Sequence, residues 1–322
     1  MGRQWQSRSA EPILTWRVGD VRIAKVPEML LESGLDDGDI QSEGFLPEAT
    51  CRALLEIDWL QPDFITDKGE IKLSFHSLVI DTGERRILVD TCVGNHKHRP
   101  RHPFWENLNL PFLEALTQAG YPRETIDTVV CTHLHVDHVG WNTMLVEGRW
   151  LPTFPNARYL IGREDHDQCV AVGATGDGES GFMPGSVFAD SIQPIFDAGL
   201  VDLVPADHVI CEEVALLPTP GHTPGHVSVV ISSGTHRALI TGDTIHHPSQ
   251  LVHTEWNSGA DGDPRRAIDT RRDLLARMAD SDTLVIGTHW SGRSAGRVTR
   301  RDGVYALERA DEAVIGDPAC AI

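Results

Sequence analysis

The chain has 322 residues, of which 40% are hydrophobic, and its formal net charge is −19. A chain of this length and composition buries a substantial core, and α/β folds of this size are often single domains. The acidic balance argues against a protein that binds the phosphate backbone of DNA or RNA, which rewards clustered Lys and Arg. No run approaches the roughly 20 apolar residues needed to cross a bilayer, so we expect no membrane partner.

The N-terminus and the cysteines indicate a cytoplasmic location. Residues 1–10 are polar and lack the apolar core of a signal peptide. The six cysteines are scattered and form no CxxC pair, which is typical of reduced thiols in a reducing compartment. We therefore expect a cytoplasmic protein with free thiols.

The predicted elements begin with a β-hairpin. Residues 15–26 alternate apolar and polar side chains around Gly19-Asp20, as two strands joined by a tight turn do. Residues 31–42 are acidic and contain glycine, so we expect an exposed loop. Apolar residues at helical spacing within 47–60 predict a short helix.

Strands and helices alternate in the next part of the chain. Residues 72–81 and 86–90 predict two strands, and 111–120 an amphipathic helix closed by a glycine. The β-branched run 126–131 predicts a buried strand, and 157–161 another short one. This order is typical of an α/β protein.

The remaining segments are of three kinds. The glycine-rich residues 173–187 show no phosphate-binding pattern, so we expect a long irregular loop of the kind that often forms a lid. Residues 267–279 predict a helix with its arginines outside, and 283–286 a strand. The tail 302–322 is weakly patterned, and we expect it to fray.

The densest cluster of chemical groups lies directly after the strand predicted at 126–131. Burying several imidazoles and a carboxylate without partners costs several kcal/mol each, and a metal ion removes that cost. Imidazole and carboxylate suit zinc, iron, manganese or nickel, and the absence of Cys from the set argues against a closed structural zinc site. A solvated His-rich turn is the alternative. The cluster is His133, His135, Asp137 and His138, in the pattern HxHxDH.

Further ligand candidates follow strand-like segments at long intervals. His222 lies in the turn Pro-Gly-His-Thr-Pro-Gly-His, Asp243 follows a Gly, and His289 ends a late Gly-x-His. Together with HxHxDH, this ordered set resembles the metallo-β-lactamase-fold hydrolase superfamily over roughly residues 70–295.

The resemblance implies an α/β fold, the metallo-β-lactamase-like αββα sandwich, with two mixed β-sheets and helices outside. It implies a single domain over residues 1–322. Within it we expect an N-terminal extension at 1–60, a catalytic core at 61–300 and a C-terminal tail at 301–322. A homodimer formed through the N-terminal segment is expected from the resemblance alone.

The resemblance also implies that seven ligands hold two divalent metal ions. Zinc is the expected metal, although the same ligands accept Mn, Fe, Co or Ni. Metal coordination lowers the pKa of water from about 15.7 toward 7, which predicts hydrolysis by a metal-bridging hydroxide. Asp137 is also the expected proton acceptor. The expected sets are His133, His135 and His222 on one ion, Asp137, His138 and His289 on the other, and Asp243 bridging both.

Within the superfamily, the chain looks most like the lactonase and organophosphate (methyl parathion) hydrolase branch, which keeps the bridging Asp. Many acyl-homoserine lactonases place a tyrosine three residues after that Asp, where this chain has His246. His246 could donate the same hydrogen bond to a carbonyl oxygen, act as acid for the leaving alkoxide, or only support the ligands.

The sequence therefore predicts a dinuclear metal-dependent hydrolase, a lactonase or esterase acting on a small molecule. An organophosphate triesterase or arylesterase using the same centre is the first alternative. A metal-binding module without hydrolytic activity is the second.

Several other residues are candidates for supporting roles at the site. Asp90 either orients a ligand or ends a turn, and His226 is expected to be structural rather than a ligand. His253 and Trp256 are candidates for lining the pocket. The basic segment 96–102 either lines a pocket for an anionic substrate or forms a solvated loop.

Overall fold

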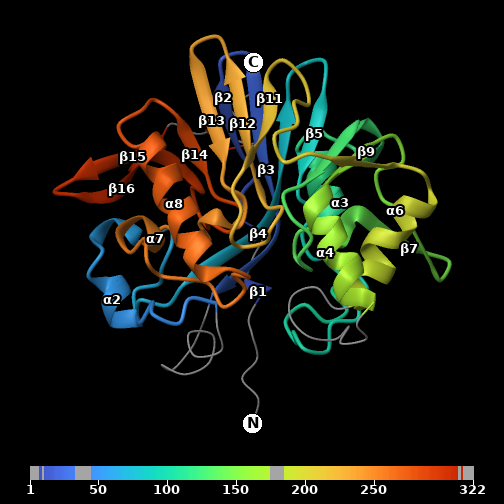
Figure 1. The fold of residues 1–322 in the computed structure, drawn as a ribbon, viewed down its shortest axis with the longest axis horizontal. Helices are drawn as coiled ribbons and strands as arrows, with labels where there is room; N and C mark the ends of the chain where they lie inside the picture. Colours follow the sequence, from blue (N-terminus) through green and yellow to red (C-terminus); the bar gives the residue numbers. More distant parts are fainter. Residues whose placement is uncertain (1–6, 9–10, 33–44, 175–184, 311–312, 315–322) are drawn as a thin grey trace. The chain divides into compact units, whose positions relative to one another are not determined.

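The computed structural model describes residues 7–8, 11–32, 45–174, 185–310 and 313–314 (Figure 1). The chain divides into two compact units. The expected single domain over residues 1–322, with its divisions at 60 and 300, stays a prediction. Unit 1 comprises Met1–Glu11, Met29–Ser74 and Val209–Glu312, and unit 2 comprises Pro12–Glu28, Phe75–His208 and Ala313–Ile322.

Unit 2 contains most of a mixed sheet with the strand order β10-β9-β6-β5-β4-β3-β2-β17, in which residues 29–32 of β3 and 72–74 of β4 are assigned to unit 1. Its β5, β6, β9 and β10 are parallel to one another, whereas β4 pairs antiparallel with β5, and β2 with β3. Separately, β7 and β8 form an antiparallel hairpin. The strands are β2 (Leu14–Val18), β3 (Val21–Glu32), β4 (Lys72–Asp81), β5 (Arg86–Val89), β6 (Thr128–Cys131), β7 (Thr143–Val146), β8 (Arg149–Pro152), β9 (Arg158–Gly162), β10 (Val201–Val204) and β17 (Ala313–Val314).

The helices of unit 2 include the amphipathic helix predicted at 111–120. In this helix, α3, Phe112 and Leu116 are buried, and the Phe112 ring stacks on Trp141 with 5.5 Å between ring centroids. The ends of the glycine-rich segment 173–187 belong to α4 and α5, and residues 175–184 lie outside the described residues, so the lid hypothesis stays a prediction. The helices are α3 (Phe112–Gln118), η2 (Arg123–Thr125), η3 (Gly140–Asn142), α4 (Arg163–Ala174), α5 (Gly185–Val187), η4 (Phe188–Ile192) and α6 (Gln193–Asp197).

Unit 1 holds a second mixed sheet, in the order β11-β12-β13-β14-β15-β16. Here β13 and β14 are parallel, because the chain between them returns through helices, and the other pairs are antiparallel. The elements are β1 (Ser7–Arg8), α2 (Cys51–Leu55), η1 (Asp58–Leu60), β11 (Val214–Pro218), β12 (Val227–Ser233), β13 (His236–Ile240), η5 (Gly242–Thr244), α7 (Ser249–Val252), α8 (Pro264–Met278), β14 (Leu284–Ile286), β15 (Ala295–Arg301) and β16 (Val304–Arg309).

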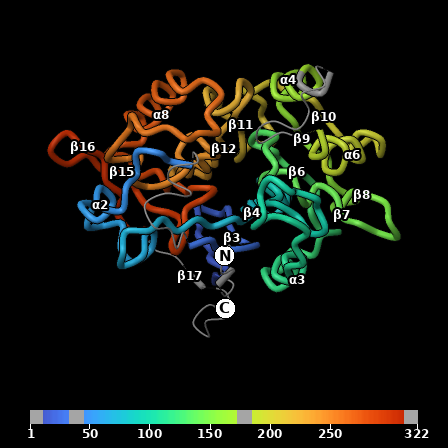
Figure 2. The backbone as a smooth tube through the Cα atoms, turned by 90° about the horizontal axis from the view of Figure 1, so that it is seen from below, coloured from blue at the N-terminus to red at the C-terminus, as the bar shows by residue number. Residues whose placement is uncertain are grey.

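The longest helix of unit 1, α8, lies alongside β15 (Figure 2). Its N-cap Asp263 accepts a hydrogen bond from the Arg266 N–H, and Pro264 occupies the first turn. Leu274 and Leu275 are buried as expected, but the expectation that all arginines of this helix point outside is wrong. Arg271 is 0% exposed, because its guanidinium donates a hydrogen bond to the buried Thr244 carbonyl.

Most predicted strands are confirmed, and the exceptions lie near the edges of elements. The expected loop at 31–42 begins two residues later, because Leu31 and Glu32 still belong to β3, and 33–44 lie outside the described residues. The helix expected at 47–60 is shorter and consists of α2 and η1. Part of the weakly patterned tail forms a regular strand, since β16 pairs with β15 along its whole length.

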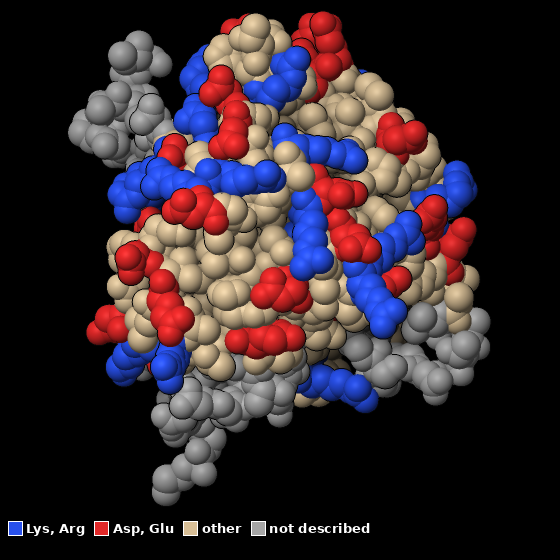
Figure 3. Space-filling view, turned by 60° about the vertical axis from the view of Figure 1, so that its left-hand side comes forward, with Lys and Arg blue, Asp and Glu red and all other residues tan. Residues whose placement is uncertain are grey.

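The surface of the described residues mixes charges of both signs. Acidic and basic side chains alternate over the face shown in Figure 3. The negative net charge is therefore not concentrated in one patch on this face. Among the described residues, no helix combines the length and apolar character needed to cross a membrane.

Candidate metal-binding site

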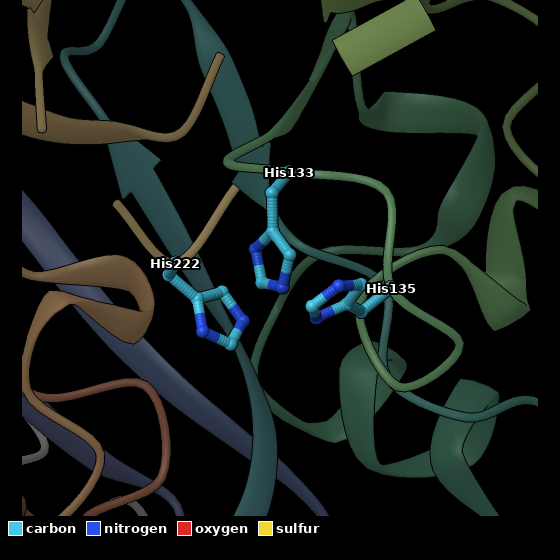
Figure 4. Close-up of side chains that lie close together, drawn as sticks. All are labelled: His133, His135 and His222. Atoms are coloured by element: carbon cyan, nitrogen blue, oxygen red, sulfur yellow. The ribbon is translucent and has the colours of Figure 1, made fainter. Parts of the chain in front are cut away.

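The HxHxDH segment of unit 2 begins where β6 ends. Its loop is closed by a hydrogen bond from the His138 N–H to the His135 carbonyl, at 3.0 Å. The ring centroid of His133 lies 4.0 Å from that of His138 and 4.6 Å from that of His135. Figure 4 shows the His133 and His135 side chains projecting from this loop. Three buried imidazoles thus lie close together in one short loop.

Asp90, which follows β5, contacts one of these histidines. Its Oδ2 accepts a hydrogen bond from His138 Nδ1 at 2.8 Å, and its two oxygens also accept from the Thr132 N–H and hydroxyl, both at 2.8 Å. The bond to Nδ1 places the ring proton there, so Nε2 is the nitrogen that carries the lone pair, and it lies 3.7 Å from Asp137 Oδ2. Asp90 therefore contacts a predicted ligand, and its role in orienting that ligand stays a prediction.

A buried glutamate that the sequence interpretation missed supports the segments next to this loop. Glu28 accepts hydrogen bonds from the Val93 and Gly94 N–H groups at 2.9 Å and from Trp141 Nε1 at 2.7 Å. Burial raises the pKa of its carboxyl to about 7. The contact also requires Gly140, because a Cβ there would lie 1.7 Å from the Val93 carbonyl oxygen. Nothing local in the sequence marks Glu28 for this role.

In unit 1, the carboxylate of Asp243 is the centre of a second cluster. Three imidazole Nε2 atoms approach its oxygens: His222 at 3.4 Å, His246 at 3.3 Å and His289 at 3.2 Å. The Thr288 hydroxyl donates to Asp243 Oδ1 at 3.1 Å. All these side chains are buried. The predicted ligands follow strands. His222, which is labelled in Figure 4, follows β11, Asp243 follows β13, and His289 follows β14.

His222 is held by a carboxylate on its other ring nitrogen. Its Nδ1 donates to Asp261 Oδ1 at 2.9 Å. Burial raises the pKa of the Asp261 carboxyl above its ordinary value. The sequence interpretation missed Asp261, because it lies 39 residues from His222 and belongs to no ligand motif.

His226 is structural, as predicted. Its Nδ1 donates to the Thr219 carbonyl at 3.0 Å, and its Nε2 accepts from the backbone N–H of Asp243 at 2.8 Å. Both ring nitrogens are therefore used inside unit 1. The close approach also explains Gly242, which has a φ of +54° and where a Cβ would lie 2.6 Å from His226 Nε2. His226 thus fixes the backbone that carries Asp243.

His246 lies among the predicted ligands of unit 1. Its ring centroid is 4.7 Å from that of His222 and 5.5 Å from that of Phe45. Gln250 Oε1 accepts from the His246 N–H at 2.8 Å, which fixes the backbone. Neither ring nitrogen of His246 has a hydrogen-bond partner among the described residues. The side chain is therefore positioned by packing and by the approach of Nε2 to Asp243 Oδ2, at 3.3 Å.

The other pocket candidates pack against each other. The rings of His253 and Trp256 stack with 4.0 Å between centroids and 9° between planes. Gln250 Nε2 donates to the Trp256 carbonyl at 2.9 Å, so this stack is tied to the His246 loop. The hypothesis that His253 and Trp256 line the substrate pocket stays a prediction.

Neither reading of the basic segment 96–102 is correct for Lys97 and Arg99. Lys97 and Arg99 are buried, and Arg99 donates to both oxygens of Asp190, at 2.7 and 2.8 Å. Lys97 Nζ donates to the Thr143 hydroxyl at 2.6 Å and lies 3.6 Å from the centroid of the Trp150 ring. Asp190 is therefore the counter-charge of both Lys97 and Arg99 within unit 2.

The buried His247 is expected to make the stability of the folded protein depend measurably on pH. Its Nε2 donates to the Phe64 carbonyl at 3.0 Å and its Nδ1 accepts from the Ser249 N–H at 3.2 Å, so the ring is neutral. Burial lowers its pKa from 6.5 to about 4. The unfolded chain binds this proton more readily than the folded chain does. The contribution of the neutral ring to the free energy of unfolding is therefore fully present above pH 6.5 and is lost as the pH falls toward 4. We expect a loss on the order of 3 kcal/mol.

Urea unfolding of the metal-free protein at pH 7, 5.5 and 4 measures this effect. His247→Gln, which keeps a donor toward Phe64 and does not titrate, is expected to remove that part of the pH dependence. His236→Gln changes an exposed histidine at the start of β13 and is expected to leave it intact. Equal pH dependence in His247→Gln and the wild type would contradict the assignment.

The donor chemistry of both clusters fits divalent metal ions. Within each unit, a buried histidine donates one ring nitrogen to a carboxylate, as in His138 with Asp90 and His222 with Asp261. That arrangement is typical of metal-ligating histidines, because it fixes the tautomer and the ring orientation. Within unit 1, His222, His246 and Asp261 also each offer a ligand atom within 4.8 Å of the other two.

The structure therefore brings the predicted residues together as two sets. His133, His135, Asp137 and His138 are gathered in unit 2, and His222, Asp243, His246 and His289 in unit 1. Their roles as metal ligands and their union in one centre stay predictions.

A family model, described as "Metallo-beta-lactamase superfamily", matches residues 76–289. This match covers more than half of the chain and includes every predicted ligand. The chain belongs to the metallo-β-lactamase superfamily.

Relatives with known names are similar at low identity. The "Probable metallo-hydrolase YflN" of Bacillus subtilis is 28% identical over 37% of this chain and 45% of its own length. The "Probable metallo-hydrolase Mb2322c" of Mycobacterium bovis is 28% identical over 56% of this chain and 60% of its own length. An "N-acyl homoserine lactonase" from a Bacillus species is 26% identical over 59% of this chain and 69% of its own length. The chain thus spans about half the length of the first two.

Solved structures resemble this one over nearly the whole chain. The "hydrolase AbOPH in beta lactamase superfamily" has a TM-score of 0.75 at 21% identity and covers 94% of this chain and 99% of its own. "AidC, a Dizinc Quorum-Quenching Lactonase" has a TM-score of 0.73 at 20% identity and covers 93% and 98%. At these identities the likeness shows the fold, which confirms the predicted metallo-β-lactamase-like α/β class with two mixed sheets.

Proposed function

We propose that the protein is a metal-dependent hydrolase that opens a lactone or cleaves a related ester in a small molecule. The observation that carries the proposal is the approach of three buried imidazoles, from His222, His246 and His289, to the single carboxylate of Asp243. A cluster of this kind is costly to bury unless a cation compensates it. Membership of the superfamily and the lactonase names among the relatives support the same function.

The two donor sets serve one dinuclear centre in this proposal. The family model runs without a break across residues of both units, which supports their joint use. Zinc is the proposed metal, because imidazole and carboxylate ligands suit it. The proposed sets are His133, His135 and His222 for one ion, Asp137, His138 and His289 for the other, and Asp243 between them.

Bound divalent ions would lower the pKa of a water molecule and polarise the carbonyl oxygen of the substrate. The residues of the chain provide the remaining functions. Asp137 accepts the proton of the attacking water, and Asp90 and Asp261 fix two histidine tautomers. His246 donates a hydrogen bond from its ring to the carbonyl oxygen or to the leaving alkoxide, since neither ring nitrogen makes a hydrogen bond among the described residues.

A metal-controlled substrate panel tests the proposal. The zinc-loaded protein is assayed on acyl-homoserine and simple lactones, aryl esters and paraoxon-like phosphotriesters. We expect the highest kcat/KM on a lactone or ester, loss of turnover with a chelator, and recovery on adding zinc.

The same panel separates the alternatives. A clear preference for phosphotriesters would instead support the organophosphate hydrolase alternative. Two bound metal equivalents with no turnover of any substrate would support a metal-binding module and overturn the proposed hydrolase.

A further inference from the structure

Asp261 and Arg271 form a buried ion pair next to His222 in unit 1. Asp261 Oδ1 accepts from His222 Nδ1 at 2.9 Å, and its Oδ2 accepts from the Ser258 N–H at 3.0 Å. The same Oδ2 lies 3.7 Å from Arg271 Nη2, and both side chains are 0% exposed. The carboxylate therefore has a histidine on one oxygen and a fixed cation near the other.

Arg271 also connects α8 to the loop that carries His246. Its Nε donates to the Thr244 carbonyl at 2.9 Å. Its Nη1 donates to the Thr254 carbonyl at 2.8 Å and to the Trp256 carbonyl at 2.7 Å. These carbonyls lie at the two ends of the loop, so the planar guanidinium holds both ends at once.

We infer that Asp261 and Arg271 act as a positioning pair, which holds His222 with its Nε2 directed at a metal ion and fixes the His246 loop beside it. This inference rests on the proposed function. A carboxylate that accepts from Nδ1–H leaves the lone pair on Nε2, which is the atom that lies 3.4 Å from Asp243. Arg271 compensates the buried negative charge that this role requires of Asp261.

Zinc affinity tests the pair without relying on turnover. The dissociation constants of the metal-free protein are measured by competition with a chromogenic chelator, for the wild type and Asp261→Asn. Asparagine keeps the size of the side chain but lacks the charge that orients the Nδ1–H. We expect one zinc equivalent to bind about 10- to 100-fold more weakly and the other to stay close to wild type.

A matched control lies two residues away. Asp263→Ala removes the N-cap of α8 without touching His222, so it costs about 1 kcal/mol of stability and leaves zinc binding unchanged. If Asp263→Ala weakened zinc binding as much as Asp261→Asn, the effect would come from the helix and the inference would fail.

The Arg271→Lys variant tests whether Arg271 acts through Asp261. Lysine keeps the positive charge but cannot hold both ends of the loop and face Asp261 together. We expect Arg271→Lys to weaken zinc binding in the wild type and to add little in an Asp261→Asn background. Unchanged constants in Asp261→Asn overturn the pair alone, whereas a wild type that binds no zinc overturns the proposed function with it.

Discussion

Replacing Asp243 with alanine is expected to reduce the proposed lactone or ester hydrolysis by roughly a thousandfold or more. The reason is that three predicted ligand or catalytic histidines of unit 1 face this one carboxylate, at 3.2 to 3.4 Å. Without it, three buried imidazoles lie close together with no negative charge among them, so a cation is held less tightly. The measurement is kcat/KM together with the metal content of the purified protein.

Two controls separate this effect from general damage. Asp282→Ala removes an exposed carboxylate of the same unit and is expected to leave activity and metal content unchanged. His133→Ala removes a predicted ligand from unit 2 and is expected to lower activity as strongly as Asp243→Ala. Full activity in both ligand variants would refute the dinuclear mechanism.

The parts of the site that were predictable from the sequence are those set by local pattern. β6, β11, β13 and β14 are short apolar segments, and the polar residues after each mark where a strand ends. This pattern places His133, His222, Asp243 and His289 at strand ends. A contact between Asp90 and a ligand is also predictable, because a carboxylate directly after a strand is a candidate to orient a ligand, and the structure shows His138 as its partner.

The supporting residues were not predictable, because their contacts are distant in the chain. Glu28 binds backbone groups about 65 residues away, and Asp261 binds a histidine 39 residues away. Arg271 has the spacing of a solvent-facing helix residue, yet its donors satisfy carbonyls of a separate loop. Helical periodicity reports which side chains are apolar, and it does not report which polar side chain has internal partners.

The largest expected loss of stability belongs to such a distant contact, between Asp190 and Arg99 in unit 2. Asp190→Asn leaves Arg99 buried without a counter-charge, because an arginine does not deprotonate in a protein. Lys97, whose pKa burial lowers to about 7, lies 3.5 Å from the same carboxylate and loses this partner as well. Breaking a buried pair by removing one member costs about 3–5 kcal/mol. Urea unfolding at pH 7 is expected to show a loss of that size.

A second Arg–Asp pair in unit 2 serves as the matched control. Arg158 donates to both oxygens of Asp202, as Arg99 does to Asp190, but its side chains are 44% and 47% exposed. Solvent screens that pair, so Asp202→Asn is expected to cost no more than about 1 kcal/mol. Because the two pairs share their chemistry and differ in burial, the difference between the variants measures the contribution of burial. Equal losses in both would show that desolvation of Arg99 and Lys97 does not govern the stability of unit 2.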